Sequence, residues 1–151
     1  MLESLLVAIV LITLTVAIHM VGLLALMSFL QARSRRIRPF RSRVRQGVFT
    51  LIIVLGLVVI HGVEILIYGV SYRLLDVFPT MEAALYYSTS AFTTVGFGDV
   101  AIENEWRLLG ALEGLNGFLL IGWSTAFLVA VIGRMRSMEM DWLDRMRDGA
   151  D

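Results

Sequence analysis

Three long stretches without Asp, Lys or Arg constrain this chain more than any other feature. Residues 4–32 also lack Glu, and residues 46–72 and 108–133 each contain a single Glu, Glu64 and Glu113. A helix needs about 20 apolar residues to cross a bilayer core, so each stretch is long enough. Residues 4–32 are too long for a cleaved signal peptide and follow no basic residue. We therefore predict an all-α membrane protein with three transmembrane helices.

The composition agrees with a membrane protein and excludes several other classes. Hydrophobic residues make up 58% of the chain and charged residues only 17%, against roughly 25% in soluble domains. The net charge of zero argues against a nucleic-acid partner. Without cysteine, the chain has no disulfide or thiolate metal site. The sequence contains no nucleophile–base pair, metal cluster or phosphate loop, so we expect no enzyme.

The arginines predict how the chain is oriented in the membrane. Seven of them lie between the first two stretches: Arg33, Arg35, Arg36, Arg38, Arg41, Arg43 and Arg45. Four more follow the third stretch: Arg134, Arg136, Arg145 and Arg147. Cytoplasmic loops are enriched in basic residues, so we expect both segments in the cytoplasm and the N-terminus outside. Residues 73–107, with two Arg against five acids, then also lie outside. The Arg33–Arg45 loop could bind anionic lipid head groups, although topology alone also explains its charge.

A short helix is expected within the outer segment. Pro79 and Thr80 resemble a helix start, and Glu82 lies in the first turn, where the helix dipole favours an acid. Residues 81–92 would rise only about 18 Å, which is too short to cross the membrane. A short apolar helix followed by Gly-rich chain is typical of a re-entrant loop, whose irregular backbone must be buried or line water.

Residues 93–99, Thr-Thr-Val-Gly-Phe-Gly-Asp, form the most informative motif. An ion leaving water must exchange its hydration shell for other oxygens, and backbone carbonyls can provide them without net charge. Gly96 and Gly98 supply the backbone freedom that is needed to direct successive carbonyls towards one axis. Thr94 can add a hydroxyl oxygen, while Val95 and Phe97 would point away from the axis.

This motif resembles the filter of the potassium channel pore family, Thr-Val-Gly-Tyr/Phe-Gly-Asp, and Thr94 to Asp99 match it throughout. The resemblance implies ion sites formed by the carbonyls of Thr94, Val95, Gly96 and Phe97, with Gly98 completing the filter. It also places Tyr86 and Tyr87 in an aromatic cuff around the filter. Ser90 stands where some members carry a buried Glu facing the Asp after the filter, so how Asp99 is held remains open.

The apolar stretches and the arginines predict an N-terminal transmembrane helix (1–32), an Arg-rich cytoplasmic loop (33–47) and a short cytoplasmic tail (135–151), and the resemblance covers the pore domain between them (48–134). Within the pore domain it implies an outer helix (48–72), a pore helix (81–92), the filter (93–99) and an inner helix (107–134). Because the chain contains one filter, four chains must form the pore. The tail could lie at the membrane interface or form a four-helix bundle below the pore. The first helix has no Arg or Lys, so it cannot sense voltage strongly, and we expect it to pack peripherally against the outer helix.

Several residues inside the predicted spans have two readings. Gly117 and Gly122 could be gating hinges, or small residues that allow close helix packing. Glu113 could brace the back of the filter through Ser90 or a pore-helix Tyr, or could pair with Arg107; Asn116 could line a cavity. His19 and His61 are each read as isolated packed residues, with a pH-sensing role as the alternative.

The sequence thus predicts a potassium-selective channel subunit in the cell membrane, assembled as a homotetramer, with K⁺ as permeant ion and no cofactor. One alternative is a weakly selective cation channel, because the Phe97 ring cannot donate the hydrogen bond that a Tyr would make. Another is a non-conducting subunit of a potassium transport complex. Such transporters usually carry four degenerate filters in one chain, whereas this chain carries one intact filter.

Overall fold

The structure, a computed structural model, describes residues 2–36, 43–100, 102 and 105–148. It contains four helices in these ranges: α1 (Leu2–Arg36), α2 (Arg43–Leu74), α3 (Met81–Phe92) and α4 (Arg107–Asp148). Three segments are long and apolar enough to cross a membrane, Leu2–Ala32, Gln46–Leu74 and Arg107–Arg134, with mean hydropathies of 2.6, 2.6 and 2.0. The protein is therefore an all-α, multi-pass membrane protein, as the sequence predicts.

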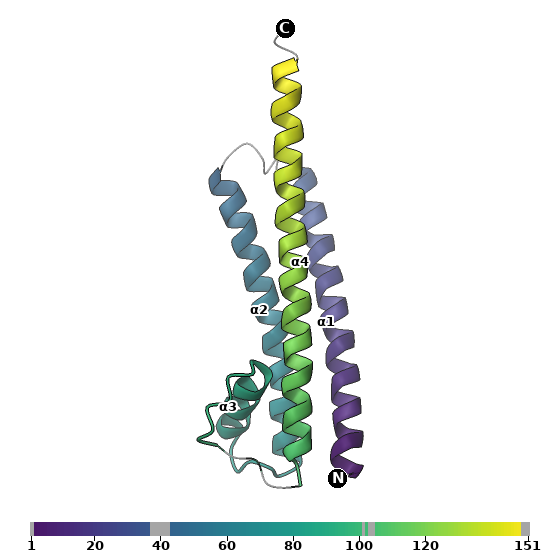
Figure 1. The fold of residues 1–151 in the computed structure, drawn as a ribbon, viewed down its shortest axis with the longest axis vertical. Coiled ribbons are helices and arrows are strands. Elements are labelled where there is room, and N and C mark those ends of the chain that lie inside the picture. The colour runs from purple at the N-terminus through teal and green to yellow at the C-terminus, as the bar shows by residue number, and fades with distance from the viewer. Residues whose placement is uncertain (1, 37–42, 101, 103–104, 149–151) are drawn as a thin grey trace.

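The three long helices run side by side, and the short helix α3 lies at one end of them (Figure 1). The N-terminus lies at the same end as α3, and the C-terminus lies at the opposite end (Figure 1). Helix α3 contacts both α2 and α4. This arrangement brings α3 and the chain that follows it to the end of the bundle predicted to face outside.

The N-cap residue Thr80 fixes the start of helix α3 at Met81. Thr80 has extended backbone angles, and its hydroxyl accepts a hydrogen bond from the Ala83 N–H at 3.2 Å, which satisfies one of the free donors of the first turn. Glu82 lies in that turn. Ala84, Ser88 and Phe92 lie on one face of the helix at a four-residue spacing and are buried. The cap and this face hold α3 across the ends of α2 and α4.

Helix α1 packs more deeply than the peripheral position expected from the sequence. It contacts α4 as well as α2. Its Ala8 and Leu11 join the buried cluster that contains Tyr68, Tyr72 and Phe92. A second cluster further along joins α1 to α2 through Leu23, Leu30, Ile53 and Leu57. The first helix is thus an integral part of the bundle.

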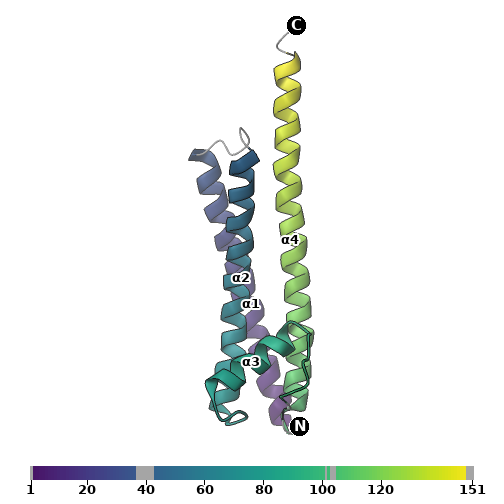
Figure 2. The ribbon, with the colours of Figure 1, turned by 90° about the vertical axis from the view of Figure 1, so that its left-hand side faces the viewer.

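The helix ends differ from the predicted boundaries. Helix α2 begins at Arg43 rather than 48, and α4 continues to Asp148 rather than ending at 134. The predicted tail is therefore largely a continuation of α4, which extends well beyond the ends of α1 and α2 (Figure 2). The central part of the Arg-rich loop, residues 37–42, lies outside the described residues, as do the tail side chains on which the interface and bundle readings depend.

Candidate functional site

The backbone after α3 alternates in handedness. Thr94, Gly96 and Gly98 have positive φ angles of 60°, 60° and 77°, and the residues between them do not. In an extended strand successive carbonyls point to opposite sides, whereas alternation of left- and right-handed angles turns successive N–H groups to one side and the carbonyls to the other. Glycine adopts such angles without cost, and Thr94 is one of two described non-glycine residues with positive φ.

The N–H side of this segment is held by the last turn of α3. Four consecutive N–H groups donate hydrogen bonds to it: Thr94 to the Ala91 carbonyl (2.9 Å), Val95 and Gly96 to the Ser90 carbonyl (3.1 and 3.2 Å), and Phe97 to the Ser90 hydroxyl (3.1 Å). The carbonyl oxygens of the same four residues accept no hydrogen bond within the described part of the chain. The arrangement leaves a row of unpaired carbonyls on an exposed segment.

Ser90 therefore directly supports residues 93–99, the predicted filter, which is called the filter segment below. Its hydroxyl and its carbonyl together accept three of the four hydrogen bonds described above, and the residue is buried. Because a Ser hydroxyl is short, it can reach the Phe97 N–H but leaves Asp99 to another partner.

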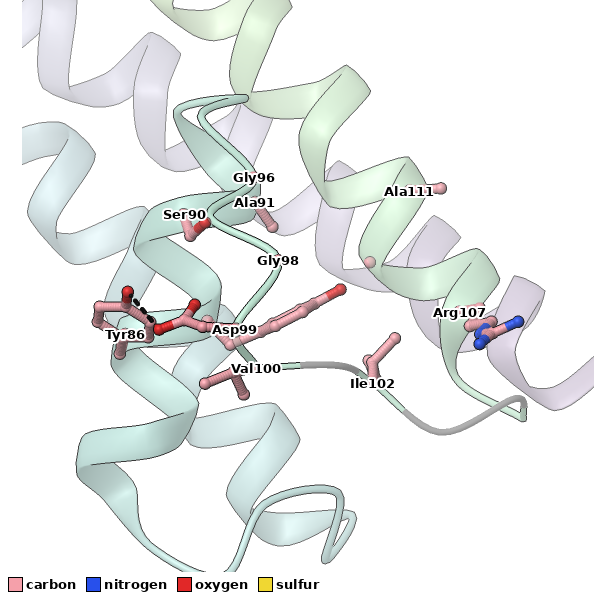
Figure 3. Close-up of a pocket in the computed structure, with 12 residues that line it drawn as sticks. Tyr86, Ser90, Ala91, Gly96, Gly98, Asp99, Val100, Ile102, Arg107 and Ala111 are labelled. Atoms are coloured by element: carbon pink, nitrogen blue, oxygen red, sulfur yellow. Dashed lines mark hydrogen bonds between the residues drawn. The ribbon is translucent and has the colours of Figure 1, made fainter.

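Asp99 is held by Tyr86. The Tyr86 hydroxyl donates a hydrogen bond to the Asp99 carboxylate at 2.9 Å (Figure 3). This hydrogen bond raises the pKa of the Tyr86 phenol above its ordinary value, so the phenol remains a protonated donor at neutral pH. The Tyr86 ring also stacks on the Phe97 ring, with centroids 5.8 Å apart and planes 19° apart. Tyr86 thus contacts the filter segment at both Phe97 and Asp99.

Tyr87 has a different environment from Tyr86. Its ring packs against Tyr72 and Phe78, with centroids 5.4 and 5.0 Å away, and its hydroxyl lies against Gly110 of α4. A cavity of about 350 Å³ lies between α3, the filter segment and α4, and both tyrosines line it together with Gly96 and Gly98 (Figure 3). Tyr87 therefore joins α3 to α2 and α4 behind the filter segment.

Glu113 has partners other than those predicted. It is fully buried, and its carboxylate accepts hydrogen bonds from the hydroxyls of Tyr72 on α2 and Ser88 on α3, both at 2.6 Å. Ser90 bonds to the filter segment, Tyr86 bonds to Asp99, and Arg107 is exposed. No hydrogen bond in the described part of the chain joins Glu113 to Ser90, to a pore-helix tyrosine or to Arg107, so the predicted pairings were wrong, while the predicted contact with the pore helix is made through Ser88. The carboxylate joins α4 to α2 and α3, and two hydroxyl donors satisfy it in a setting where an unpaired carboxylate would be costly.

The two hinge candidates differ in their surroundings. A Cβ at Gly117 would lie 2.7 Å from the carbonyl carbon of Phe92 and closer still to its oxygen, whereas a Cβ at Gly122 would meet nothing within 4 Å. Gly117 therefore lets the end of α3 rest directly on α4. Asn116 is also buried, and its amide donates to Thr15 of α1 and Tyr68 of α2, so it joins α4 to the other two long helices.

The sequence reading of His19 and His61 as isolated residues was wrong. The Nδ1 atoms of both lie within hydrogen-bond distance of the Glu64 carboxylate, His19 at 2.9 Å and His61 at 2.8 Å. His61 Nε2 lies 3.0 Å from the Ser124 hydroxyl of α4. The three-residue spacing of His61 and Glu64 places them on one helix face and was a usable signal. Nothing local in the sequence connects His19 with them.

A comparison with known families finds that the sequence model described as "Ion channel" matches residues 47–134. Neither the comparison with curated proteins nor that with solved structures found a match. The matched region contains α2, α3, the filter segment and the membrane-spanning part of α4, and it covers more than half of the chain. The chain belongs to the two-transmembrane ion channel family.

Proposed function

We propose that this chain is a subunit of a potassium-selective channel that conducts passively through a homotetrameric pore. The observation that supports the proposal most is the row of unpaired carbonyls from Thr94 to Phe97, whose N–H groups are all bonded to α3. Potassium channels replace the hydration shell of the ion with such carbonyls. In the proposed pore, the Thr94 hydroxyl adds an oxygen at the inner end of the filter.

Four copies are required because one row of carbonyls cannot surround an ion. The filter segment is exposed in the single chain, and large apolar side chains such as Leu115, Phe118 and Leu119 are exposed on α4, which suits contact with other copies and with lipid. In a four-fold ring, the C-terminal ends of the α3 helices would direct their negative dipole ends towards the axis and stabilise a cation there. Channels of this family typically form oligomeric pores.

The proposed orientation places the N-terminus and the filter segment outside and the C-terminus in the cytoplasm of a cell membrane. The Arg-rich segments support it by the positive-inside rule, and so does the position of the N-terminus at the α3 end of the bundle. The Arg33–Arg45 loop would then lie beside the inner leaflet, where anionic lipids could bind it. Without basic residues in the α1 span, gating by a voltage sensor is not proposed.

Weak selectivity is the second candidate, and it rests on Phe97. Among the described residues its one aromatic contact is the stacking on Tyr86, and Phe has no hydroxyl to bond to the surrounding wall. If this stacking contact does not hold the filter rigidly, the selectivity for potassium over sodium would be reduced.

Ion flux from liposomes that contain the purified protein tests the proposal. We expect potassium flux well above sodium flux, block by Ba²⁺, and loss of flux in Gly96→Ala, since an L side chain resists the positive φ of that position. The matched control is Gly47→Ala, where a Cβ meets nothing within 4 Å, and it should conduct normally. Equal flux of both ions would favour the weakly selective channel, and flux unchanged in Gly96→Ala would contradict the assigned filter.

A further inference from the structure

A cluster of three titratable side chains lies away from the filter segment, between α1 and α2. This His–Glu cluster consists of His19, His61 and Glu64. His19 and Glu64 are fully buried, and the His61 side chain is 18% exposed. Each residue offers one ligand-capable atom such that all three atoms lie within 4.8 Å of one another. One helix therefore contributes a single imidazole, and the other contributes an imidazole and a carboxylate.

The donor set suits a transition metal. Two imidazole nitrogens and one carboxylate oxygen are ligands that Zn²⁺ accepts at about 2.0–2.2 Å, with a fourth position left for water. Ligand atoms of one tetrahedral ion lie roughly 3.3 Å apart by that geometry. The Nδ1 atoms of His19 and His61 lie 2.9 and 2.8 Å from the two oxygens of the Glu64 carboxylate, and the three ligand atoms lie within 4.8 Å of one another, so the donors are already gathered within the span of one coordination sphere.

Two further observations indicate a ligand rather than a hydrogen-bonded network alone. His19 Nε2 is buried and has no hydrogen-bond partner. Among the described residues it is the one buried side-chain nitrogen or oxygen in that state. His61 Nε2 is in turn bonded to Ser124, in the way that an outer hydrogen bond orients a metal-binding imidazole. The hydrogen bonds of the cluster thus leave one nitrogen of the buried His19 ring unsatisfied, while the His61 ring is already fixed in direction.

The charge of the surroundings also favours a cation. Glu64 lies within the α2 span, and residues 4–32, 46–72 and 108–133 contain no Lys or Arg to balance it. A carboxylate at membrane depth is costly without a partner. A divalent ion would supply the missing positive charge, and the exposed edge of His61 would give it access.

We propose that His19, His61 and Glu64 form a binding site for a transition-metal ion of the Zn²⁺ type. The fourth position belongs to water, because the Ser124 hydroxyl is bonded to the outer nitrogen of the His61 ring. The bound ion links α1 to α2 and lies near the end of α3, because the His61 ring packs on Phe92 of α3 and the His19 ring packs on Trp123 of α4. The site is independent of the proposed conduction and can be tested without it.

Titration of the full-length, chelator-treated protein with Co²⁺ tests the site, because tetrahedral Co²⁺ has intense visible absorption. We expect one Co²⁺ per chain, displacement by Zn²⁺, and affinity reduced at least about tenfold in His19→Gln and in Glu64→Gln. The matched control is Ser28→Ala, which removes an exposed α1 hydroxyl that bonds only to its own helix. Size-exclusion chromatography and circular dichroism check that each variant folds and assembles.

X-ray absorption spectroscopy of the Zn²⁺-loaded wild-type protein gives a second readout that needs no variant. Two imidazole ligands per ion are expected. The proposal is overturned if the wild-type protein binds no Co²⁺, if folded His19→Gln and Glu64→Gln bind it as tightly as Ser28→Ala does, or if fewer than two imidazoles coordinate the ion. If the variants do not fold, the number of imidazole ligands measured on the wild-type protein decides whether the proposed site exists.

Discussion

At the scale of single residues, the filter segment depends on a few side chains of α3. Ser90 accepts the hydrogen bond of the Phe97 N–H, and Tyr86 holds both the Phe97 ring and the Asp99 carboxylate. The first contact holds the Phe97 backbone and the second holds its ring, so the two are restrained separately. The alternating backbone angles require such restraint, because Thr94 adopts a positive φ that a residue with a Cβ disfavours.

Tyr86→Phe removes the hydrogen bond to Asp99 while keeping the ring that stacks on Phe97. We expect assembly to be retained and the outer end of the filter to loosen, seen as briefer conducting periods in single-channel recordings from planar bilayers. Asp99→Asn weakens the same interaction, so the double variant should behave like either single variant. Fully additive effects would show that the two residues act independently.

Ser88→Ala removes one of the two hydroxyls that satisfy the buried Glu113 carboxylate. A buried acceptor that loses a partner costs about 1–3 kcal/mol, and we expect the free energy of unfolding to fall by about that amount in denaturant titrations. Ser28→Ala, at an exposed hydroxyl of α1, should change it by less than about 0.5 kcal/mol. Equal effects of the two substitutions would contradict a bracing role for Glu113.

At the scale of helices, the contact between α3 and α4 depends on glycines. Gly110 accommodates the Tyr87 hydroxyl, and Gly117 accommodates the carbonyl of Phe92. The end of α3, from which the filter segment begins, therefore rests on the backbone of α4. A movement of α4 at this level would be transmitted to the base of the filter. Gly117 can therefore serve both as a small residue that allows close packing and as a gating hinge.

Gly117→Ala and Gly122→Ala form a matched pair on α4. The first places a Cβ against the Phe92 backbone, which must shift, and overpacking of this kind typically costs about 1–3 kcal/mol. We expect Gly117→Ala to reduce thermal stability and selective flux, and Gly122→Ala, with open space around it, to retain both. Altered open probability in a stable Gly122→Ala channel would instead identify Gly122 as a hinge.

The sequence predicted the features that depend on local signals. Hydropathy identified the three spans, the Thr80 cap marked the start of α3, and Gly96 and Gly98 indicated the unusual backbone. It could not predict which helix faces meet, because a lipid-facing surface is as apolar as a packed one. The buried stripe of α1, which includes Ser4, Ala8, Thr15 and His19, does not stand out from its exposed faces by hydrophobicity. The His–Glu cluster and the true partners of Glu113 were missed for that reason.

At the scale of the whole molecule, the bundle has two distinct ends. The N-terminus, α3 and the filter segment lie at one end, and the C-terminal part of α4 extends from the other (Figures 1 and 2). In the proposed channel the first end faces outside, so that ions enter through the filter and leave past the cytoplasmic part of α4.

Single cysteines in this cysteine-free chain test that orientation. Glu3→Cys and Glu82→Cys, both at exposed positions of the α3 end, should react with a membrane-impermeant maleimide added to intact cells. Arg134→Cys, exposed near the other end of the α4 span, should react only after permeabilisation. The reverse pattern would contradict the assignment of the arginines to the cytoplasm.

The central claim is that the carbonyls of residues 94–97 select potassium, and the reversal potential of the purified protein in a planar bilayer tests it most directly. With potassium on one side and an equal concentration of sodium on the other, we expect a large reversal potential of the sign set by potassium permeation. We also expect Gly96→Ala to abolish this current. A wild-type reversal potential near zero, with current carried equally by both ions, would contradict the claim.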